Sequence, residues 1–320
     1  SSSFLEHAAK YSKQMIKELD LDQNSFVIEI ASNDGYLLKN FVSASIPCLG
    51  IEPTDSTANK ADQIGVPTLR EFFSESLANK LVKEGNQADL IAGNNVYAHV
   101  PDINDFTKGL KAILKTNGTI TLEFPHLMSL LDYSQFDTVY HEHFSYLSLH
   151  AVVSIFDSCD LRIFDVEKLS THGGSIRILG CHKNDPRKTS KSVLQLLDEE
   201  IKKGITSIET YKNFQKKAEK IKNDLISFLI DKKNKGQTVV AYGAAAKGNT
   251  LMNFSGLKTD LIKFVCDAAE AKQNKYMPGS HIPIFSPKIN APLRLPTAII
   301  LVFPSASGIP LLYFLSSDTG

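Results

Sequence analysis

The chain has 320 residues, of which 42% are hydrophobic, and its 35 Lys and Arg residues balance 35 Asp and Glu residues. A length well above that of one typical domain predicts two hydrophobic cores. Because the charges cancel and no basic stripe dominates a segment, we expect neither nucleic acid nor an anionic membrane as partner, and favour a small or neutral ligand.

The first half of the chain alternates helix-like and strand-like segments. Apolar residues at helical spacing predict a helix over 4–19. Short apolar runs predict buried strands at 26–30, 47–52, 88–93 and 118–124, with a helix-like pattern at 106–114. Alternation of this kind is typical of an α/β fold with a parallel, doubly wound sheet. Two further strands, at 161–166 and 175–180, are expected to complete that sheet.

The second half begins with a charged helical segment. From about 190 to 235, apolar residues spaced three or four apart predict a packing face between domains. A strand at 238–242, a small-residue turn at 243–249 and strands at 261–266 and 297–302 then predict a second, smaller α/β domain.

The turn after the first predicted strand is a candidate nucleotide site. Such a turn faces the ligand crevice of a doubly wound sheet, and Asn33, Asp34 and Gly35 lie there. Glu52, at the end of the next strand, can accept hydrogen bonds from both ribose hydroxyls. The turn has one glycine, and the charge of Asp34 opposes a diphosphate but suits a sulfonium. We therefore expect S-adenosylmethionine rather than NAD; the alternative is an ordinary turn.

Two polar clusters follow. Asn94, Asn95 and His99 come at the end of a predicted strand, where open α/β sheets bind ligands, although a lone histidine is also common as a structural residue. The block Tyr140-His141-Glu142-His143 joins a phenol, a carboxylate and two imidazoles. Such a group suits removal of a weakly acidic proton. The alternative is a cluster at a helix N-terminus that is bonded to its own backbone.

Cysteine usage and the N-terminal sequence predict a cytoplasmic protein. The four cysteines are scattered singly, so we expect structural thiols in a reducing compartment and no metal site. The N-terminal residues lack the basic and then apolar pattern of a signal peptide, and no apolar run reaches about eighteen residues. Secretion and membrane spanning are therefore not expected.

The chain resembles the S-adenosylmethionine-dependent sugar C-methyltransferases, which act on nucleotide-linked 4-keto deoxysugars. The resemblance covers nearly the whole sequence and rests on seven ordered blocks, at 29–35, 50–53, 94–101, 140–143, 172–177, 242–250 and 278–284. It implies a class I methyltransferase domain with a Rossmann-like, doubly wound sheet, and a second, smaller Rossmann-like domain that helps to hold the nucleotide sugar. The resemblance also implies that the reaction site lies between the two domains.

The same resemblance implies roles for individual residues. Methyl transfer to carbon requires a carbanion equivalent, which the enolate of a neighbouring ketone supplies. His143 is the implied base, Tyr140 and Glu142 orient the substrate or stabilise the enolate, and His99 is a further polar partner. The residues predicted to bind the cofactor are Glu29, Ser32, Asn33, Asp34, Gly35, Glu52, Pro53, Phe73, Asn94 and Asn95. Those predicted to bind the nucleotide sugar are His141, His172, Gly173, Arg177, Tyr242, Lys247, Asn249 and His281.

These interpretations give an expected domain order and function. We expect an N-terminal helix over 1–22, a methyltransferase domain over 23–189, a helical linker over 190–235 and a substrate-binding domain over 236–320. Members of the family commonly begin with a four-cysteine zinc-binding element, which we do not expect in this chain. The tail from 304, which carries no tryptophan, is expected to be disordered. Alternatives to C-methylation are sugar O-methylation, nucleotide-sugar binding without turnover, and an NAD-dependent oxidoreductase.

Overall fold

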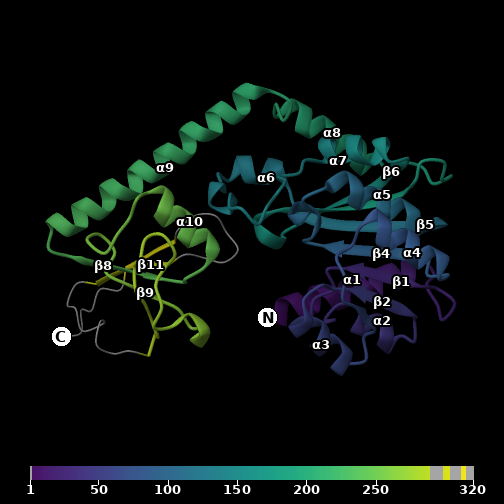
Figure 1. The fold of residues 1–320 in the computed structure, drawn as a ribbon. Coiled ribbons are helices and arrows are strands. Elements are labelled where there is room, and N and C mark those ends of the chain that lie inside the picture. Colours follow the sequence, from purple (N-terminus) through teal and green to yellow (C-terminus); the bar gives the residue numbers. More distant parts are fainter. Residues whose placement is uncertain (1, 289–297, 303–310, 315–320) are drawn as a thin grey trace. The chain divides into compact units, whose positions relative to one another are not determined.

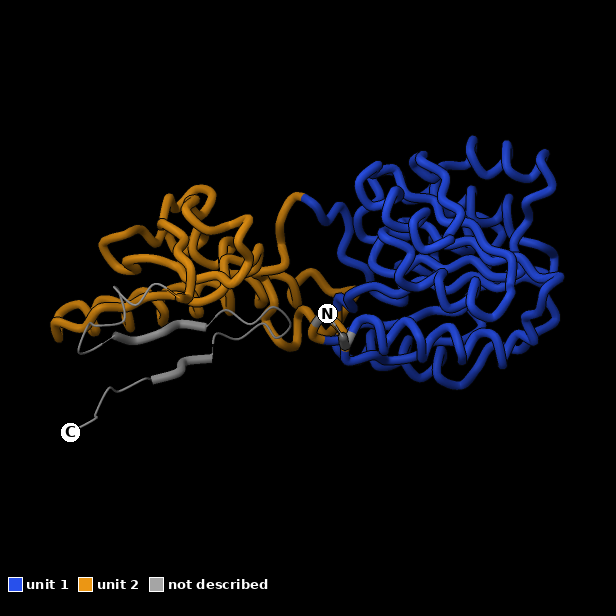
Figure 2. The backbone as a smooth tube through the Cα atoms, turned by 90° about the horizontal axis from the view of Figure 1, so that it is seen from below, with its two compact units in different colours: residues 1–127, 142–170, 174–203 blue, residues 128–141, 171–173, 204–320 orange. Residues whose placement is uncertain are grey.

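The computed structural model describes residues 2–288, 298–302 and 311–314. The chain folds into two compact units, which Figure 2 shows in different colours. Unit 1 comprises residues 1–127, 142–170 and 174–203, and unit 2 comprises 128–141, 171–173 and 204–320. The predicted tail from 304 lies outside the described residues, apart from 311–314. None of the helices in the described part of the chain is long and apolar enough to cross a membrane.

Unit 1 is built on a seven-stranded sheet with the order β3-β2-β1-β4-β5-β7-β6 (Figure 1). Its strands are β1 (Val27–Ile30), β2 (Cys48–Ile51), β3 (Thr68–Leu69), β4 (Ala88–Asn94), β5 (Leu114–Pro125), β6 (Leu161–Leu169) and β7 (Ser175–His182). The six predicted strands are confirmed, and β3 was not predicted. The expectation of an all-parallel sheet was wrong, because β7 pairs antiparallel with both β5 and β6. A short connection joins β6 to β7, so these two strands form a hairpin.

Helices cover both faces of this sheet, which explains why β1 is buried along its whole length. They are α1 (Ser2–Glu18), α2 (Lys39–Ser43), α3 (Asp55–Gln63), α4 (Glu75–Lys83), α5 (Ile103–Ile113), α7 (Leu149–Ser158) and α8 (Lys191–Lys202), while α6 (Leu127–Asp132) begins at the unit boundary. The predicted helix over 4–19 is confirmed as α1. Ala8, Tyr11 and Met15, three and four residues apart, pack against Val27 and Leu90 of the sheet.

A fully buried carboxylate connects α8 to the start of α7. Glu200 Oε1 lies 2.6 Å from His126 Nε2 and accepts a 2.7 Å hydrogen bond from Leu149 N, while Oε2 accepts one of 2.8 Å from His150 N. A negative charge at a helix N-terminus is favourable because the first amides have no partner within the helix. Glu200 therefore anchors α7 from inside the core.

Replacing Glu200 with glutamine should lower the free energy of unfolding by about 1–3 kcal/mol, because the amide group can no longer accept hydrogen bonds through both of its ends. Chemical denaturation followed by circular dichroism measures this change. The matched control is Glu199→Gln, whose carboxylate is 45% exposed and pairs with Lys168 on the surface. That variant should change stability by less than about 1 kcal/mol. Equal effects of the two substitutions would contradict the anchoring role of Glu200.

Unit 2 contains a five-stranded sheet with the order β10-β9-β8-β11-β12. The strands are β8 (Thr238–Tyr242), β9 (Val265–Cys266), β10 (Ile284–Phe285), β11 (Ala298–Val302) and β12 (Leu311–Phe314), and only the β11–β12 pairing is antiparallel. The predicted strands at 238–242 and 297–302 are confirmed within the described residues, whereas the strand predicted over 261–266 is limited to β9. Residue 261 ends a turn, and 262–264 lead into β9 without regular secondary structure.

Two helices and one inserted segment complete unit 2. The long helix α9 (Ile208–Asn234) and the shorter α10 (Ala246–Phe254) contribute Leu229 and Met252 to its core. The apolar stripe predicted as a packing face between domains instead packs on this core. Phe136, in the one-turn helix η2 (Phe136–Thr138), lies in the same core with its ring 5.2 Å from that of Phe254. This contact explains why 128–141 belongs to unit 2.

Candidate active site

The turn after β1 has an unusual backbone. Ala31, Asn33 and Gly35 all have positive φ angles, of 58°, 54° and 74°. Glycine at position 35 avoids the backbone strain that a side chain would cause at this φ angle. It also avoids steric crowding, since a Cβ there would lie 3.1 Å from Ala61 Cβ. Left-handed conformations at non-glycine residues are costly and concentrate at functional sites. Asn33 and Asp34 are exposed at the tip of this turn.

Glu52 closes the turn from the neighbouring strand. Its side chain is buried, and Oε2 accepts a hydrogen bond of 3.1 Å from Asn33 N while Oε1 accepts one of 2.9 Å from Thr54 N. Each carboxylate oxygen has two lone pairs, so each keeps one for a further donor. The carboxylate is thus held in place with one lone pair left on each oxygen, and its role toward ribose hydroxyls stays a prediction. Pro53 follows it and is half-buried.

Three buried polar atoms near this turn have no hydrogen-bond partner among the described residues. They are Glu29 Oε2, Ser32 Oγ and Asn94 Oδ1. Burial raises the pKa of the Glu29 carboxyl well above its ordinary range, and the charges of Asp34 and Glu52 raise it further. Because a buried polar atom without a partner costs about 1–3 kcal/mol, such atoms indicate a site that a ligand completes.

The end of β4 and the segment that precedes α4 carry the remaining predicted cofactor residues. Asn94 pairs in register with Glu123 of β5, and Asn95 N donates a 2.8 Å hydrogen bond to the Glu123 carbonyl. Phe73 lies edge-on to Phe106, with ring centroids 5.1 Å apart, and its ring rests against Gly109 of α5. Asn94 and Asn95 therefore lie at the carboxyl edge of the sheet, as the sequence predicted.

The predicted base lies in a cluster of rings. His143 lies 4.7 Å from His99 and 5.7 Å from Tyr146, measured between ring centroids. His99 Nδ1 is 2.9 Å from the carbonyl oxygen of Glu142, and Phe144 N donates a 2.9 Å hydrogen bond to Ala98 O. These backbone contacts join the segment from 142 to the one-turn helix η1 (Tyr97–His99). The structure thus brings His99 and His143 together, although 44 positions separate them in the sequence.

The alternative of a cluster at a helix N-terminus is wrong. The block Tyr140-His141-Glu142-His143 lies in a bend and a turn, and the next helix, α7, begins only at Leu149. Tyr140 and His141 belong to unit 2, whereas Glu142 and His143 belong to unit 1. His141 and Glu142 are exposed and Tyr140 is half-buried.

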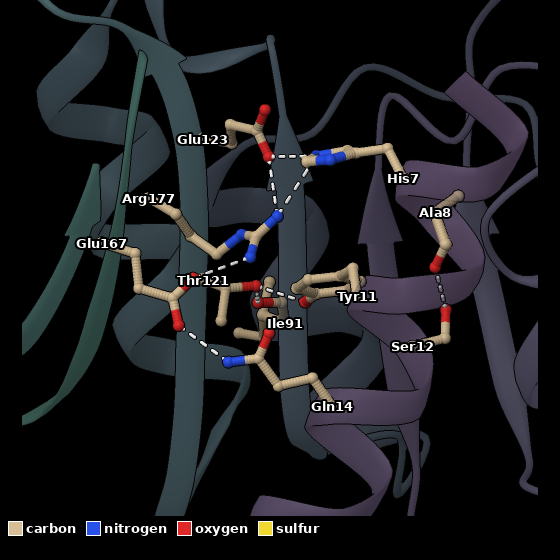
Figure 3. A network of polar contacts seen from close by, with 10 residues as sticks. All are labelled: His7, Ala8, Tyr11, Ser12, Gln14, Ile91, Thr121, Glu123, Glu167 and Arg177. Carbon is tan, nitrogen blue, oxygen red and sulfur yellow. Dashed lines mark hydrogen bonds and ion pairs between the residues drawn. The ribbon is translucent and has the colours of Figure 1, made fainter. Parts of the chain in front are cut away.

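Arg177, predicted to contact the substrate, is buried in a polar network of unit 1 (Figure 3). Its Nη2 donates to Glu123 Oε2 and its Nη1 to Glu167 Oε2, both at 3.0 Å. His7 Nε2, from α1, lies 2.9 Å from the same oxygen of Glu123, and the guanidinium lies 4.7 Å above the ring of Tyr11. Both carboxylates and an aromatic face therefore already surround Arg177, and its role in substrate binding stays a prediction.

The predicted residues of unit 2 lie around the turn after β8. Tyr242 ends that strand with an exposed ring, and Lys247 Nζ and Asn249 Oδ1, both on α10, are buried without hydrogen-bond partners among the described residues. Asp137 is similar, since its Oδ1 is also unpaired; burial raises the pKa of its carboxyl and the charge of Lys247 opposes that rise. These three side chains form a second set of polar groups suited to a ligand.

The other predicted substrate residues are spread over unit 2. His172 and Gly173 lie in the one-turn helix η3 (Thr171–Gly173), where the carbonyl of Gly173 accepts a 2.9 Å hydrogen bond from Gln135 Nε2. His281 is exposed, with a φ of 59°. Within the described ranges, no group of three His, Cys, Asp or Glu residues is placed to hold a metal ion.

Sequence reasoning missed Asp267, which follows β9 directly. Its Oδ2 accepts a 2.7 Å hydrogen bond from Ala244 N and its Oδ1 one of 2.8 Å from Ala269 N. Burial works in the opposite direction, but these hydrogen bonds and the charge of Lys272 lower the pKa of its carboxyl. The signal was present in the sequence, because Asp267 directly follows the second strand of its unit just as Glu52 does.

Comparisons with known proteins identify both parts of the chain. Residues 4–166 match the model of a methyltransferase domain, and residues 170–307 match that of the C-methyltransferase C-terminal domain. C-methyltransferase NovU of Streptomyces niveus is 33% identical over 288 residues, which are 90% of this chain and 69% of that protein.

Solved structures are more distant in sequence. PH0226 protein from Pyrococcus horikoshii OT3 is 14% identical, with a TM-score of 0.47, over 57% of this chain and 92% of its own. Magnesium protoporphyrin IX methyltransferase from Synechocystis PCC 6803, with bound S-adenosylhomocysteine, is 11% identical, with a TM-score of 0.45, over 56% of this chain and 83% of its own.

The family models and the geometry agree on the cofactor. Unit 1 has the Rossmann-like, doubly wound sheet of class I methyltransferases. The unpaired atoms of Glu29, Ser32 and Asn94 fit a ligand with hydroxyl, amino and carboxylate groups, and S-adenosylmethionine carries all three. The chain therefore belongs to the S-adenosylmethionine-dependent C-methyltransferases.

Proposed function

We propose that the enzyme methylates a nucleotide-linked 4-keto deoxysugar at the carbon next to its ketone. The observation that carries this proposal is the contact between the rings of His99 and His143, whose centroids lie 4.7 Å apart, on a segment whose backbone is bonded to η1, the one-turn helix after β4. An imidazole in this position can remove a weakly acidic C–H proton near neutral pH. C-methylation requires such a base, and the relative NovU is itself named a C-methyltransferase.

In this proposal the cofactor occupies the turn after β1. When bound, S-adenosylmethionine supplies an electrophilic methyl group on a positively charged sulfur. Glu52 accepts the ribose hydroxyls through its two remaining lone pairs, and Glu29, Ser32 and Asn94 gain partners from the cofactor's polar groups. Asn33, Asp34, Gly35, Pro53, Phe73 and Asn95 complete the proposed binding set.

The proton moves from the sugar carbon to the neutral imidazole of His143. The electron pair of that C–H bond passes into the enolate, whose charge rests on the former ketone oxygen, and the carbon becomes the nucleophile. Tyr140 and Glu142 are proposed to orient the ketone or to stabilise this charge. His99 lies against His143 and keeps its ring in place.

The nucleotide part is assigned to unit 2. Lys247 Nζ and Asn249 Oδ1 are buried without partners among the described residues, and a diphosphate would give the ammonium group an anion to bind. His141, His172, Gly173, Arg177, Tyr242 and His281 remain proposed contacts to the nucleotide sugar. The buried ammonium group of Lys247 lies near the charge of Asp137 but makes no hydrogen bond among the described residues, which supports an anionic substrate.

Incubation with 4-keto nucleotide sugars should produce a product with a new carbon–methyl bond, identified by mass spectrometry and NMR. In deuterated water, without cofactor, the substrate should also gain deuterium at the carbon next to the ketone, because only an enolate route exchanges that proton. Transfer to a hydroxyl oxygen, with no exchange, would overturn the proposal and identify a sugar O-methyltransferase. Substrate binding with neither exchange nor product would indicate a binding protein.

A further inference from the structure

Both units contain the same arrangement of four strands and one turn. The order β3-β2-β1-β4 in unit 1 recurs as β10-β9-β8-β11 in unit 2, with all strands parallel. The residue after the first strand of each unit donates to the last residue of the second, as Ala31 N does to Ile51 O and Gly243 N to Cys266 O, both at 2.8 Å. Both donors have positive φ angles, 58° and 98°.

The acidic residue that follows the second strand is repeated as well. Glu52 N donates to Leu69 O of β3 at 2.9 Å, and Asp267 N donates to Phe285 O of β10 at 3.0 Å. Each carboxylate then accepts one amide from the turn and one from the residue two positions after itself. The aspartate is one methylene shorter than the glutamate, which explains why its turn partner lies one position nearer to the strand.

Backbone amides therefore occupy the same number of lone pairs on the two carboxylates. Asp267 Oδ1 and Oδ2 each accept one backbone amide, which leaves one lone pair on each oxygen for a ligand. The side chain is 12% exposed, so it is fixed in position yet reachable. In doubly wound sheets an acidic residue at this place binds ribose hydroxyls.

The charges around the two turns differ in sign. The turn of unit 1 is acidic, since Asp34 accompanies Glu52 there. In unit 2, Lys272 Nζ lies 3.6 Å from Asp267 Oδ2 and donates a 2.8 Å hydrogen bond to Ala244 O. Lys247, three positions after Ala244 in the sequence, has a buried Nζ without a hydrogen-bond partner among the described residues. A cationic ligand suits the first turn, and a ligand with an anion beside its hydroxyls suits the second.

We propose that Asp267 binds the ribose of the nucleotide in the sugar substrate, so that unit 2 holds a nucleoside diphosphate as unit 1 holds the nucleoside of the cofactor. This inference rests on the proposed nucleotide-linked substrate. Asp267 also fixes the turn through Ala244, and a purely structural role would weaken every nucleotide equally. A carboxylate that contacts the ribose instead makes binding depend on the ribose hydroxyls.

The test measures nucleotide binding by calorimetry with the full chain, saturated with S-adenosylhomocysteine. The diphosphates of adenosine, guanosine, uridine, cytidine and thymidine identify the preferred base. The same base is then compared with its ribose hydroxyls present and as the 2′,3′-dideoxy diphosphate. Loss of the hydroxyls should weaken binding to the wild-type protein roughly 10-fold or more, because hydrogen bonds to a charged group are strong. This comparison needs no substitution and carries no risk of misfolding.

The variant Asp267→Asn completes a thermodynamic cycle in which the carboxylate and the ribose hydroxyls are removed separately and together. In this variant the dideoxy compound should bind within about 3-fold of the parent nucleotide. The matched control is Glu52→Gln, which should weaken S-adenosylhomocysteine binding and leave the hydroxyl dependence of nucleotide binding intact. If the wild-type protein bound both nucleotides equally, the role of Asp267 in ribose binding would be overturned, and the proposed nucleotide-linked substrate would stand. Equal weakening of both by Asp267→Asn, with the difference between them preserved, would do the same. Binding of no diphosphate at all would overturn the nucleotide-linked substrate together with this role.

Discussion

Replacing His143 with alanine is expected to lower kcat for methylation roughly 10²–10⁴-fold, the usual contribution of a positioned general base. The alanine variant keeps the backbone of the segment that bonds to Ala98, so the fold of unit 1 should persist. Deuterium exchange at the sugar carbon should fall with the methylation rate, because both need the same proton removed. Affinity for S-adenosylhomocysteine should stay within about 2-fold, because Glu52 and the turn after β1 are untouched.

His150→Ala is the matched control for this experiment. His150 is exposed at the start of α7, where its backbone amide donates to Glu200 Oε2 and its carbonyl accepts a hydrogen bond from Ser154 Oγ. Its replacement should leave both methylation and exchange unchanged. If His143→Ala retained the wild-type exchange rate, another group would be the base, and His143 would be left with a positioning role at most.

Replacing Arg177 with methionine is expected to lower the free energy of unfolding by about 3–5 kcal/mol, because removing one partner of a buried ion pair leaves the other charge without compensation. Glu123 and Arg177 are both only 3% exposed, and their atoms meet at 3.0 Å. Methionine and arginine have similar side-chain volumes, so the loss of stability would result from removal of the charge and not from a cavity. Urea denaturation measures this change.

The double variant Arg177→Met with Glu123→Gln keeps the test informative if the single variant does not fold. Removing both charges should recover a large part of the lost stability. The surface control is Lys183→Met, since Lys183 pairs with Asp157 where both side chains are at least 50% exposed, and its effect should stay below about 1 kcal/mol. A stable Arg177→Met variant with weakened nucleotide-sugar binding would instead support the substrate role predicted from the sequence.

Much of the fold was predictable because buried strands leave a local signal. The apolar runs that became β1, β2, β4 and β8 are short, continuous and followed by turn residues, so each could be found from its own residues. The direction of β7 could not, because periodicity records which side chains are buried and not which way a strand runs. Helix α3 was also missed, since only Ala58 and Ala61 are buried along it and its remaining residues are polar.

The candidate site was predictable where a rule ties a residue to its place in a sheet. Glu52 directly follows β2 and Asn94 is the last residue of β4, so both lie at the carboxyl edge of the sheet. Partners that depend on tertiary packing were not predictable: Arg177 meets His7 and Glu123 across 170 and 54 positions, and no local pattern encodes either contact. The rule that identified Glu52 also predicts Asp267. Asp267 was missed because the rule was applied to the first unit alone.

The path of the chain limits how this enzyme can be divided or recombined. The backbone changes unit after residues 127, 141, 170, 173 and 203, so neither half is a single continuous fragment. Breaking the chain after Lys203 would deprive the second unit of Phe136, whose ring fills its core beside Phe254, and would expose that ring on the other piece. Chimeras that exchange substrate range between relatives therefore need residues 128–141 and 171–173 to travel with the C-terminal part, and a single breakpoint will not produce a stable hybrid.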